Sequence, residues 1–252
     1  MFISQSFSQT LAYRTTSIFI VVFGTLFSLG EVIGVFVYYS YTDNIFGWDK
    51  NSFLLLIGTF SLIQYIYQFL FILQHEELMD KVIEGELDYD LIRPVDSQLL
   101  CSFRLLDIPS LINMIIPLAL IFYSIKNLDN NIHAIYFVQY ILFLFIGVLF
   151  YYLLNQFFVS LSFWIERPGK LIGLPEYLFD LASRPRSVYP KYLQIVIVFI
   201  IPVVSATNTP VNFLRGNVDI TALISLLIFT FIMFWIVRIQ WIKGIKRYAS
   251  TS

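Results

Sequence analysis

The sequence predicts an all-α integral membrane protein with six transmembrane helices, and three observations support this. Hydrophobic residues make up 58% of the 252 residues, whereas charged residues make up only 13%, about half the share that is usual in soluble domains. Several apolar runs reach roughly 20 residues, the length that a helix needs to cross a bilayer core of about 30 Å. None of these runs alternates as the strands of a membrane barrel do, so helices must satisfy the backbone hydrogen bonds within lipid.

The apolar runs place the six predicted spans at residues 17–40, 53–73, 108–125, 132–157, 191–204 and 219–241. The fifth run is short and ends at Pro202, because proline cannot continue a regular helix. No internal repeat, linker or low-complexity stretch interrupts the chain. Residues 1–252 are therefore treated as a single transmembrane domain.

A short segment before the first span has an amphipathic pattern. Ile3, Phe7 and Leu11 recur every four residues, with Ser, Gln and Thr between them. This spacing predicts a helix that lies in the membrane interface with its apolar side in lipid. A frayed terminus is the alternative.

The stretch 201–218, just before the last span, contains residues that disrupt helices. Within lipid, broken backbone persists only where it is buried in protein or lines a cavity. We therefore expect a partly re-entrant segment on the outer face, with an ordinary surface loop as the alternative. The residues that interrupt a helix here are Pro202, Pro210 and Gly216.

The basic residues predict the orientation, because Lys and Arg concentrate on the cytoplasmic side of membrane proteins. If the N-terminus is inside, thirteen of the sixteen Lys and Arg residues face the cytoplasm, and only Lys50, Lys126 and Arg215 lie outside. Both termini are therefore predicted to be cytoplasmic. The same assignment expects a helix along the cytoplasmic interface at 171–183. It also places on that side Arg184, Arg186 and Lys191.

The motifs that carry bond chemistry are missing from the sequence. His75 and His133 fall on opposite sides of the predicted membrane and Cys101 is the single cysteine, so neither a metal site nor a catalytic residue is predicted. The glycine and lysine pattern of a phosphate-binding loop is also missing. A net charge of −1 gives no excess of positive charge for binding nucleic acid.

Polarity is concentrated in the loop 74–104 between the second and third spans. The second span is expected to continue as a helix that stops at Gly85. A second short helix follows, in which Leu87 and Leu91 lie one turn apart, and Arg93-Pro94 ends it. Such a helix, with an apolar ridge and acidic flanks, fits a groove on a soluble partner; a solvated loop is the alternative. The loop's charged residues are Glu76, Glu77, Asp80, Lys81, Glu84, Glu86, Asp88, Asp90, Arg93, Asp96 and Arg104.

At this loop the sequence resembles the type 2 permeases of ATP-binding cassette (ABC) exporters, in particular the branch of the daunorubicin-resistance permeases. The segment GELDYDLIRP at 85–94 carries the resemblance. Four further similarities follow in order along the chain, at Phe163-Trp164, at RPRSVYP in 184–190, at Ile201-Pro202 with Pro210, and at WIKGIKRYAS in 241–250.

The resemblance implies a permease that pairs with a second permease chain, identical or homologous, and with two ABC ATPase subunits in a bacterial plasma membrane. ATP and Mg would bind the ATPase, and this chain would bind no cofactor. Residues 87–94 would form the coupling helix that sits in a cleft of the ATPase. Leu87 and Leu91 would be its apolar anchors, Glu86, Asp88 and Arg93 its polar contacts, and Pro94 its end.

Polar residues within the predicted spans suggest two further sites. Glu31 lies between Gly30 and Gly34, a spacing of small residues that lets another helix approach closely, so this face is a candidate for the permease–permease interface. The alternative is that Glu31 reaches the outer membrane surface. Gln64 and Gln68, one turn apart in the second span, could line a translocation path or make hydrogen bonds between helices.

Three other functions remain as alternatives. An ion- or proton-driven secondary transporter would use Glu31 as its titrating group. An intramembrane enzyme acting on lipids would need clustered acid–base groups, which the sequence does not provide. A membrane anchor for a soluble partner would transport nothing.

Overall fold

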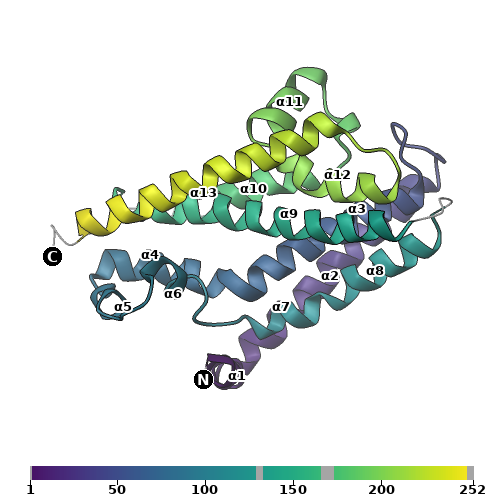
Figure 1. Ribbon diagram of the computed structural model, residues 1–252. Coiled ribbons are helices and arrows are strands. Elements are labelled where there is room, and N and C mark those ends of the chain that lie inside the picture. The colour runs from purple at the N-terminus through teal and green to yellow at the C-terminus, as the bar shows by residue number, and fades with distance from the viewer. Residues whose placement is uncertain (1, 129–132, 166–172, 249–252) are drawn as a thin grey trace.

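The computed structural model describes residues 2–128, 133–165 and 173–248. These residues form helices, turns and one isolated β-bridge between Ile45 and Trp48, without a strand. The predicted all-α fold of an integral membrane protein is confirmed. Figure 1 shows the helices as a long bundle. One end, called the Tyr248 end, carries Tyr248, the last residue of helix α13; the other, called the Trp48 end, carries the turn around Trp48.

Five helices are long and apolar enough to cross a membrane within the described residues, and they coincide with five of the six predicted spans. Two of them contain irregular turns: the second has a π-helical turn in its middle, and the third has a break at Met114. In chain order the five are α2 (Arg14–Tyr39), α3 with η1 and α4 (Lys50–Tyr67, Gln68–Ile72, Leu73–Glu84), α7 with α8 (Ile108–Asn113, Ile115–Lys126), α9 with η2 (Ala134–Ser160, Leu161–Phe163) and α13 (Ile220–Tyr248).

The core lies around α9, which contacts α3, α13 and α12 (Val203–Leu214). Aromatic rings fill it: the ring of Phe179 stacks on that of Tyr151 with centroids 4.1 Å apart and on that of Phe60 at 5.4 Å. Close packing also depends on Gly147 of α9, because a β-carbon there would lie 2.8 Å from the backbone oxygen of Ala206. The absence of a side chain at Gly147 thus lets α12 lie directly against α9.

The predicted fifth span, 191–204, is replaced by a hairpin. The helical stretches Lys191–Ile200 (α11, Lys191–Ile195, with η6, Val196–Ile200) and Val203–Leu214 meet at an angle of 86° around Pro202. Both flanks of this pair contact the same turn, since the Ser187 hydroxyl donates to Phe46 O at 3.1 Å and Arg215 Nη2 donates to Gly47 O at 2.7 Å. The segment therefore enters and leaves at the Trp48 end. A re-entrant segment was expected at 201–218, and it extends over 191–214.

Residues 174–188 make the crossing that was assigned to 191–204. They follow η2, whose Phe163 ring packs against Trp241 near the Tyr248 end at a centroid distance of 5.6 Å, and they lead to the Trp48 end. Their hydropathy is low because Pro175, Glu176 and Asp180 interrupt the apolar pattern. The crossing consists of α10 (Leu174–Asp180), η4 (Leu181–Ser183) and η5 (Arg186–Val188).

This topology corrects two sequence-based expectations. The helix expected along the interface at 171–183 crosses the bundle instead, and its residues 171 and 172 lie outside the described part of the chain. Arg184, Arg186 and Lys191 lie at the Trp48 end, since they flank the base of the hairpin. Among the described residues, eight Lys and Arg now belong to the Tyr248 end and six to the Trp48 end, so the charge bias is weaker than predicted and keeps its direction.

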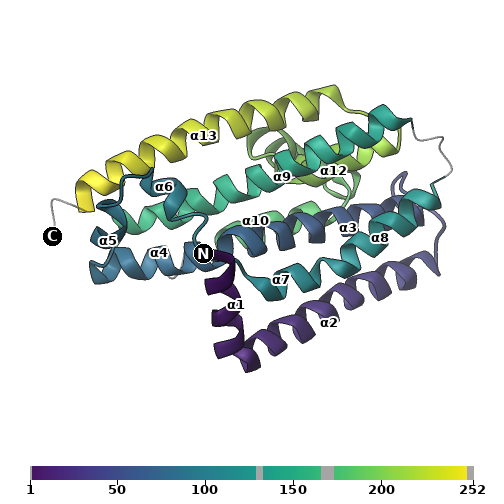
Figure 2. The same cartoon turned by 60° about the horizontal axis from the view of Figure 1, so that its bottom comes forward.

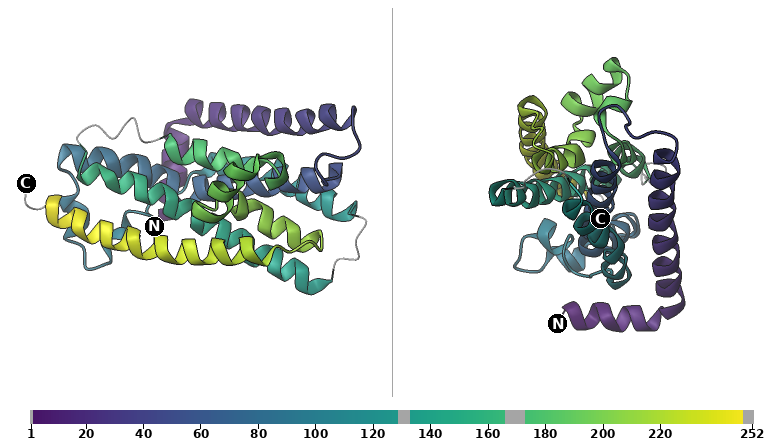
Figure 3. Two further views of the ribbon diagram at one scale, coloured as in Figure 1. Left: turned by 90° about the horizontal axis from the view of Figure 1, so that it is seen from above. Right: turned by 90° about the vertical axis from the view of Figure 1, so that its right-hand side faces the viewer.

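The N-terminal segment forms the predicted short helix, α1 (Phe2–Ala12), which turns sharply away from α2 in Figure 2. Its Ser6 hydroxyl oxygen accepts a hydrogen bond from Leu106 N at 2.9 Å, which holds it near α7. Phe7 and Leu11 are exposed, as the interfacial pattern requires; the side chain of Ile3 lies outside the described part. Figure 3 shows α2 at the edge of the bundle, where it leaves much apolar surface uncovered.

Candidate functional site

The polar segment 74–104, called the polar unit, folds compactly at the Tyr248 end. α4 ends where the sequence predicts, at Gly85, whose backbone has the left-handed φ of +77° and whose N–H bonds to Lys81 O. Glycine adopts this conformation without steric cost. The following turn is α5 (Asp88–Leu91), which ends just before Ile92, and α6 (Ser97–Leu100) comes next.

Leu87 faces the interior of the protein itself. It is fully buried, and its backbone N–H donates to the Tyr248 hydroxyl at 3.2 Å. Leu91 packs against the same group. The apolar ridge predicted from these two leucines therefore points inward, and Leu87 is not accessible to a partner. The buried group, called the Leu87 cluster, comprises Leu78, Met79, Leu87, Cys101, Val159, Phe163, Trp241 and Tyr248.

A buried carboxylate ties α5 to α4. Asp90 is only 3% exposed, and its oxygens accept from Lys81 Nζ at 2.7 Å and from Arg104 Nη1 at 3.5 Å. Lys81 also pairs with Glu77 one turn earlier, at 2.9 Å. A buried charge with two cationic partners is costly to disrupt, because removing either partner leaves the carboxylate uncompensated. The short helix is therefore held in one orientation.

A second set of contacts ties α6 to α13. Asp96 caps α6 by accepting from Leu99 N at 3.1 Å, and it also accepts from Arg238 Nη1 at 3.1 Å. The Arg238 guanidinium holds the pKa of the Asp96 carboxyl below its usual range, chiefly by this hydrogen bonding, so Asp96 keeps its charge at neutral pH. Trp241 Nε1 donates to Ser97 Oγ at 3.1 Å. The unit is thus bonded to two different transmembrane helices.

The exposed side of this unit carries different apolar residues. Tyr89 is 74% and Ile92 is 80% exposed, and the two are three residues apart on the side of α5 opposite Leu87. The surface formed by Tyr89 and Ile92 is called the Tyr89–Ile92 face. Its neighbours, all exposed, are Glu86, Asp88, Arg93, Pro94 and Val95. The spacing of Tyr89 and Ile92 was visible in the sequence, but it did not reveal which of two ridges faces outward.

The residues around Glu31 lie on two different sides of α2. The Glu31 carboxylate accepts a hydrogen bond from Ser61 Oγ of α3 at 3.2 Å, so it faces a helix of its own chain. A β-carbon added at Gly30 or Gly34 would have no atom within 4 Å. The glycines thus present an open face, and Glu31 does not belong to it.

The two glutamines of the second span have separate surroundings. Gln68 Oε1 accepts from Ser110 Oγ of α7 at 3.3 Å, and Gln68 starts the π-helical turn η1. Gln64 lies one turn away, on the side of Tyr151 in α9. Gln68 therefore makes a hydrogen bond between helices, which is one of the two roles that the sequence left open.

A buried polar chain that the sequence did not predict joins α3 and α4 to α9. Gln156 Nε2 donates to Ser160 Oγ at 3.1 Å, so its Oε1 accepts from His75 Nε2 at 2.8 Å. His75 Nδ1 is then the acceptor for the Tyr67 hydroxyl at 2.8 Å. All four side chains are buried, and each satisfies the next, as buried polar groups must. Because these residues are up to 81 positions apart in the sequence, local patterns could not predict the pairing.

The fold defines a multi-pass integral membrane protein, and the polar unit lies at one end of its bundle. A profile of the family described as "ABC-2 family transporter protein" matches residues 25–252. The chain therefore belongs to the ABC-2 family of transporter proteins, whose members are membrane permeases. No curated protein and no solved structure gives a significant match. The family match does not distinguish the daunorubicin-resistance branch. Among the described residues, no group of three or more His, Cys, Asp or Glu side chains is placed to hold a metal ion.

Proposed function

We propose that this chain is the permease subunit of an ATP-driven exporter, and that it contacts a separate ABC ATPase through the Tyr89–Ile92 face. One observation carries the proposal: an exposed apolar pair stands on a short helix that buried bonds tie to two transmembrane helices. A solvated loop would need no such attachment. Two permease chains and two ATPase subunits would form the exporter, and ATP and Mg would bind only to the ATPase.

The bonds described above provide a route for movement. A push on α5 reaches α4 through the Asp90–Lys81 pair and the Leu87 cluster. It reaches α13 through the bonds of α6 to Arg238 and Trp241. α4 continues through η1 into α3, and π-helical turns often mark functional positions within helices. Nucleotide-driven closure of the ATPases would thereby bias the transmembrane helices between two arrangements.

The proposal places the Tyr248 end in the cytoplasm of a bacterium, in accord with its larger share of basic residues. The Trp48 end, with the re-entrant hairpin, then faces outward. Glu86 and Asp88 flank the Tyr89–Ile92 face, so the docking cleft of the ATPase is expected to be locally basic. The open face at Gly30 and Gly34 is the proposed contact with the second permease chain.

The subunit composition of the native complex tests this proposal. The tagged chain, purified from its host in mild detergent, is expected to elute with an ABC ATPase. Native mass spectrometry should give two permease-type chains and two ATPase chains. The Glu31→Gln variant should keep this composition, because Glu31 bonds to Ser61 far from α5. A chain that purifies without any ATPase, and moves substrate in response to a proton gradient, would instead support the secondary transporter.

A further inference from the structure

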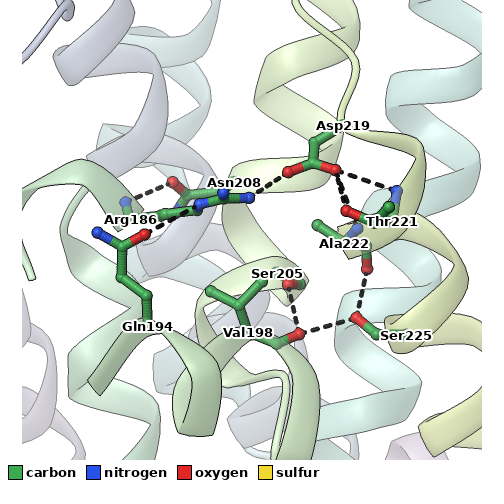
Figure 4. A network of polar contacts seen from close by, with 9 residues as sticks. All are labelled: Arg186, Gln194, Val198, Ser205, Asn208, Asp219, Thr221, Ala222 and Ser225. Carbon is green, nitrogen blue, oxygen red and sulfur yellow. Dashed lines mark hydrogen bonds and ion pairs between the residues drawn. The ribbon is translucent and has the colours of Figure 1, made fainter. Parts of the chain in front are cut away.

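The Trp48 end contains a cavity of about 280 Å³ that the proposed coupling does not use. The turn at 46–48, the re-entrant hairpin and the first turn of α13 enclose it, and Figure 4 shows the polar network on one side. Ligand pockets begin at about 300 Å³, so the cavity suits a single polar head group.

The carboxylate in the cavity wall is already satisfied. Asp219 Oδ1 accepts from Thr221 N at 3.0 Å and Ala222 N at 3.2 Å, as the cap of α13. Its Oδ2 forms an ion pair with Arg186. Arg215 stands in the wall as a second guanidinium, stacked on Trp48 at 3.7 Å. The cavity therefore holds two cationic groups against one carboxylate.

Several donors in the wall have hydrogen-bonding capacity left. Arg186 uses Nε for Gln194 Oε1 at 3.3 Å and Nη1 for Asp219, as Figure 4 shows. Thr209 is only 5% exposed and lines the cavity, where its hydroxyl can donate to a ligand. Asn212 uses its oxygen to accept from Arg215 at 3.2 Å. Guanidinium, amide and hydroxyl donors in one wall favour a ligand that is rich in acceptors and negatively charged.

An apolar groove adjoins this cavity on the side of α13. It measures about 570 Å³ and follows the side of α13 from Thr221 to Ile232, with Phe199 and Ile200 of η6 as its other wall. Val198 and Ala222 line the cavity, and the residues next to them in sequence line the groove. Ile200 and Ile228 are 58% and 54% exposed. A polar cavity beside an apolar groove is complementary to an amphiphilic molecule, with a polar head group and an apolar chain.

We propose that the cavity and the groove together bind an anionic phospholipid, with its phosphate on Arg186, Thr209 and Asn212 and one acyl chain along α13. The charge of the walls argues for a phosphate group, and the adjoining groove argues for a lipid over free phosphate. The site does not depend on the proposed transport function, because neither wall includes residues of the polar unit at the Tyr248 end.

Lipid titration of the delipidated full chain, followed by native mass spectrometry, tests the site. Dioleoyl phosphatidylglycerol is expected to bind about tenfold more tightly than dioleoyl phosphatidylcholine. Thr209→Val, which keeps the size of the side chain, should weaken phosphatidylglycerol binding about fivefold, by one hydrogen bond. Ile228→Ser should also weaken it, through the groove. Lys126→Gln, which removes a charge at the same end outside the cavity, should change nothing.

Three outcomes would overturn the assignment. Equal affinity for the two lipids would show that the negative charge of the head group does not contribute to binding. Phosphatidylglycerol binding that is unchanged in both Thr209→Val and Ile228→Ser would place the lipid elsewhere. Inorganic phosphate that displaces phosphatidylglycerol and binds as tightly in the Ile228→Ser variant would identify a site for the free anion.

Discussion

Ile92→Asp is expected to release the ATPase from the permease while the permease stays folded. Ile92 is 80% exposed, so the permease loses no internal packing. Burying an isoleucine in a partner's cleft contributes about 2 kcal/mol, and a buried aspartate there adds a desolvation cost of at least about 1 kcal/mol. Affinity should fall by at least about a hundredfold, and Tyr89→Asp should act in the same way. Co-purification measures the association, and thermal unfolding in detergent measures the fold.

The matched control is Leu87→Asp, five residues earlier in the chain and on the opposite side of α5. Leu87 is fully buried in the Leu87 cluster, and a charge buried there without a partner costs several kcal/mol. This variant should fail to accumulate or should unfold at a much lower temperature. A folded Leu87→Asp permease that has lost the ATPase, beside an Ile92→Asp permease that retains it, would restore the leucine ridge as the docking surface.

Gly147→Ala is expected to destabilise the protein strongly. The added β-carbon would lie 2.8 Å from Ala206 O and 2.8 Å from Ile63 Cδ1, and the backbone oxygen cannot rotate away. Overpacking of this kind costs about 1–3 kcal/mol, which lowers the melting temperature by roughly 2–12 °C in a chain of this size. Because α12 would move away from α9, the re-entrant hairpin should also become accessible to protease. Thermal unfolding and limited proteolysis in detergent measure the two effects.

Gly30→Ala is the control for that substitution. Gly30 also lies in a transmembrane helix, but a β-carbon there meets no atom within 4 Å. Alanine favours the helix over glycine by about 1 kcal/mol, so the isolated chain should be as stable as the unmodified protein or slightly more stable. Equal destabilisation by the two substitutions would contradict the packing of α12 on α9.

The sequence was sufficient for those parts of the fold that follow local rules. Long apolar runs predicted five spans, Gly85 predicted the end of α4, and Pro202 predicted a broken segment. The crossing at 174–188 was not predicted, because Glu176 and Asp180 lower the hydropathy of this segment. A window of hydropathy cannot tell that such a segment lies against other helices of the protein.

The sequence predicted a short helix after Gly85 but did not show which of its two ridges is exposed. Leu87 and Leu91 form one ridge of α5, and Tyr89 and Ile92 form another. Choosing between them requires the position of Tyr248, which is 161 residues away from Leu87 and bonds to its N–H. The chain from Tyr67 through His75 to Gln156 was missed for the same reason. Local periodicity defines surfaces, and only tertiary contacts decide which of them is covered.

Photo-crosslinking from the Tyr89–Ile92 face tests the central proposal most directly. A benzoylphenylalanine placed at Ile92, and in a separate variant at Tyr89, is irradiated in native membranes, with the same substitution at Lys126 of the Trp48 end as the control. An adduct with the ABC ATPase is expected from both positions of the Tyr89–Ile92 face and not from Lys126. An ATPase adduct from Lys126, or from none of the three positions, would contradict the assignment of the Tyr89–Ile92 face as the surface through which this permease is driven.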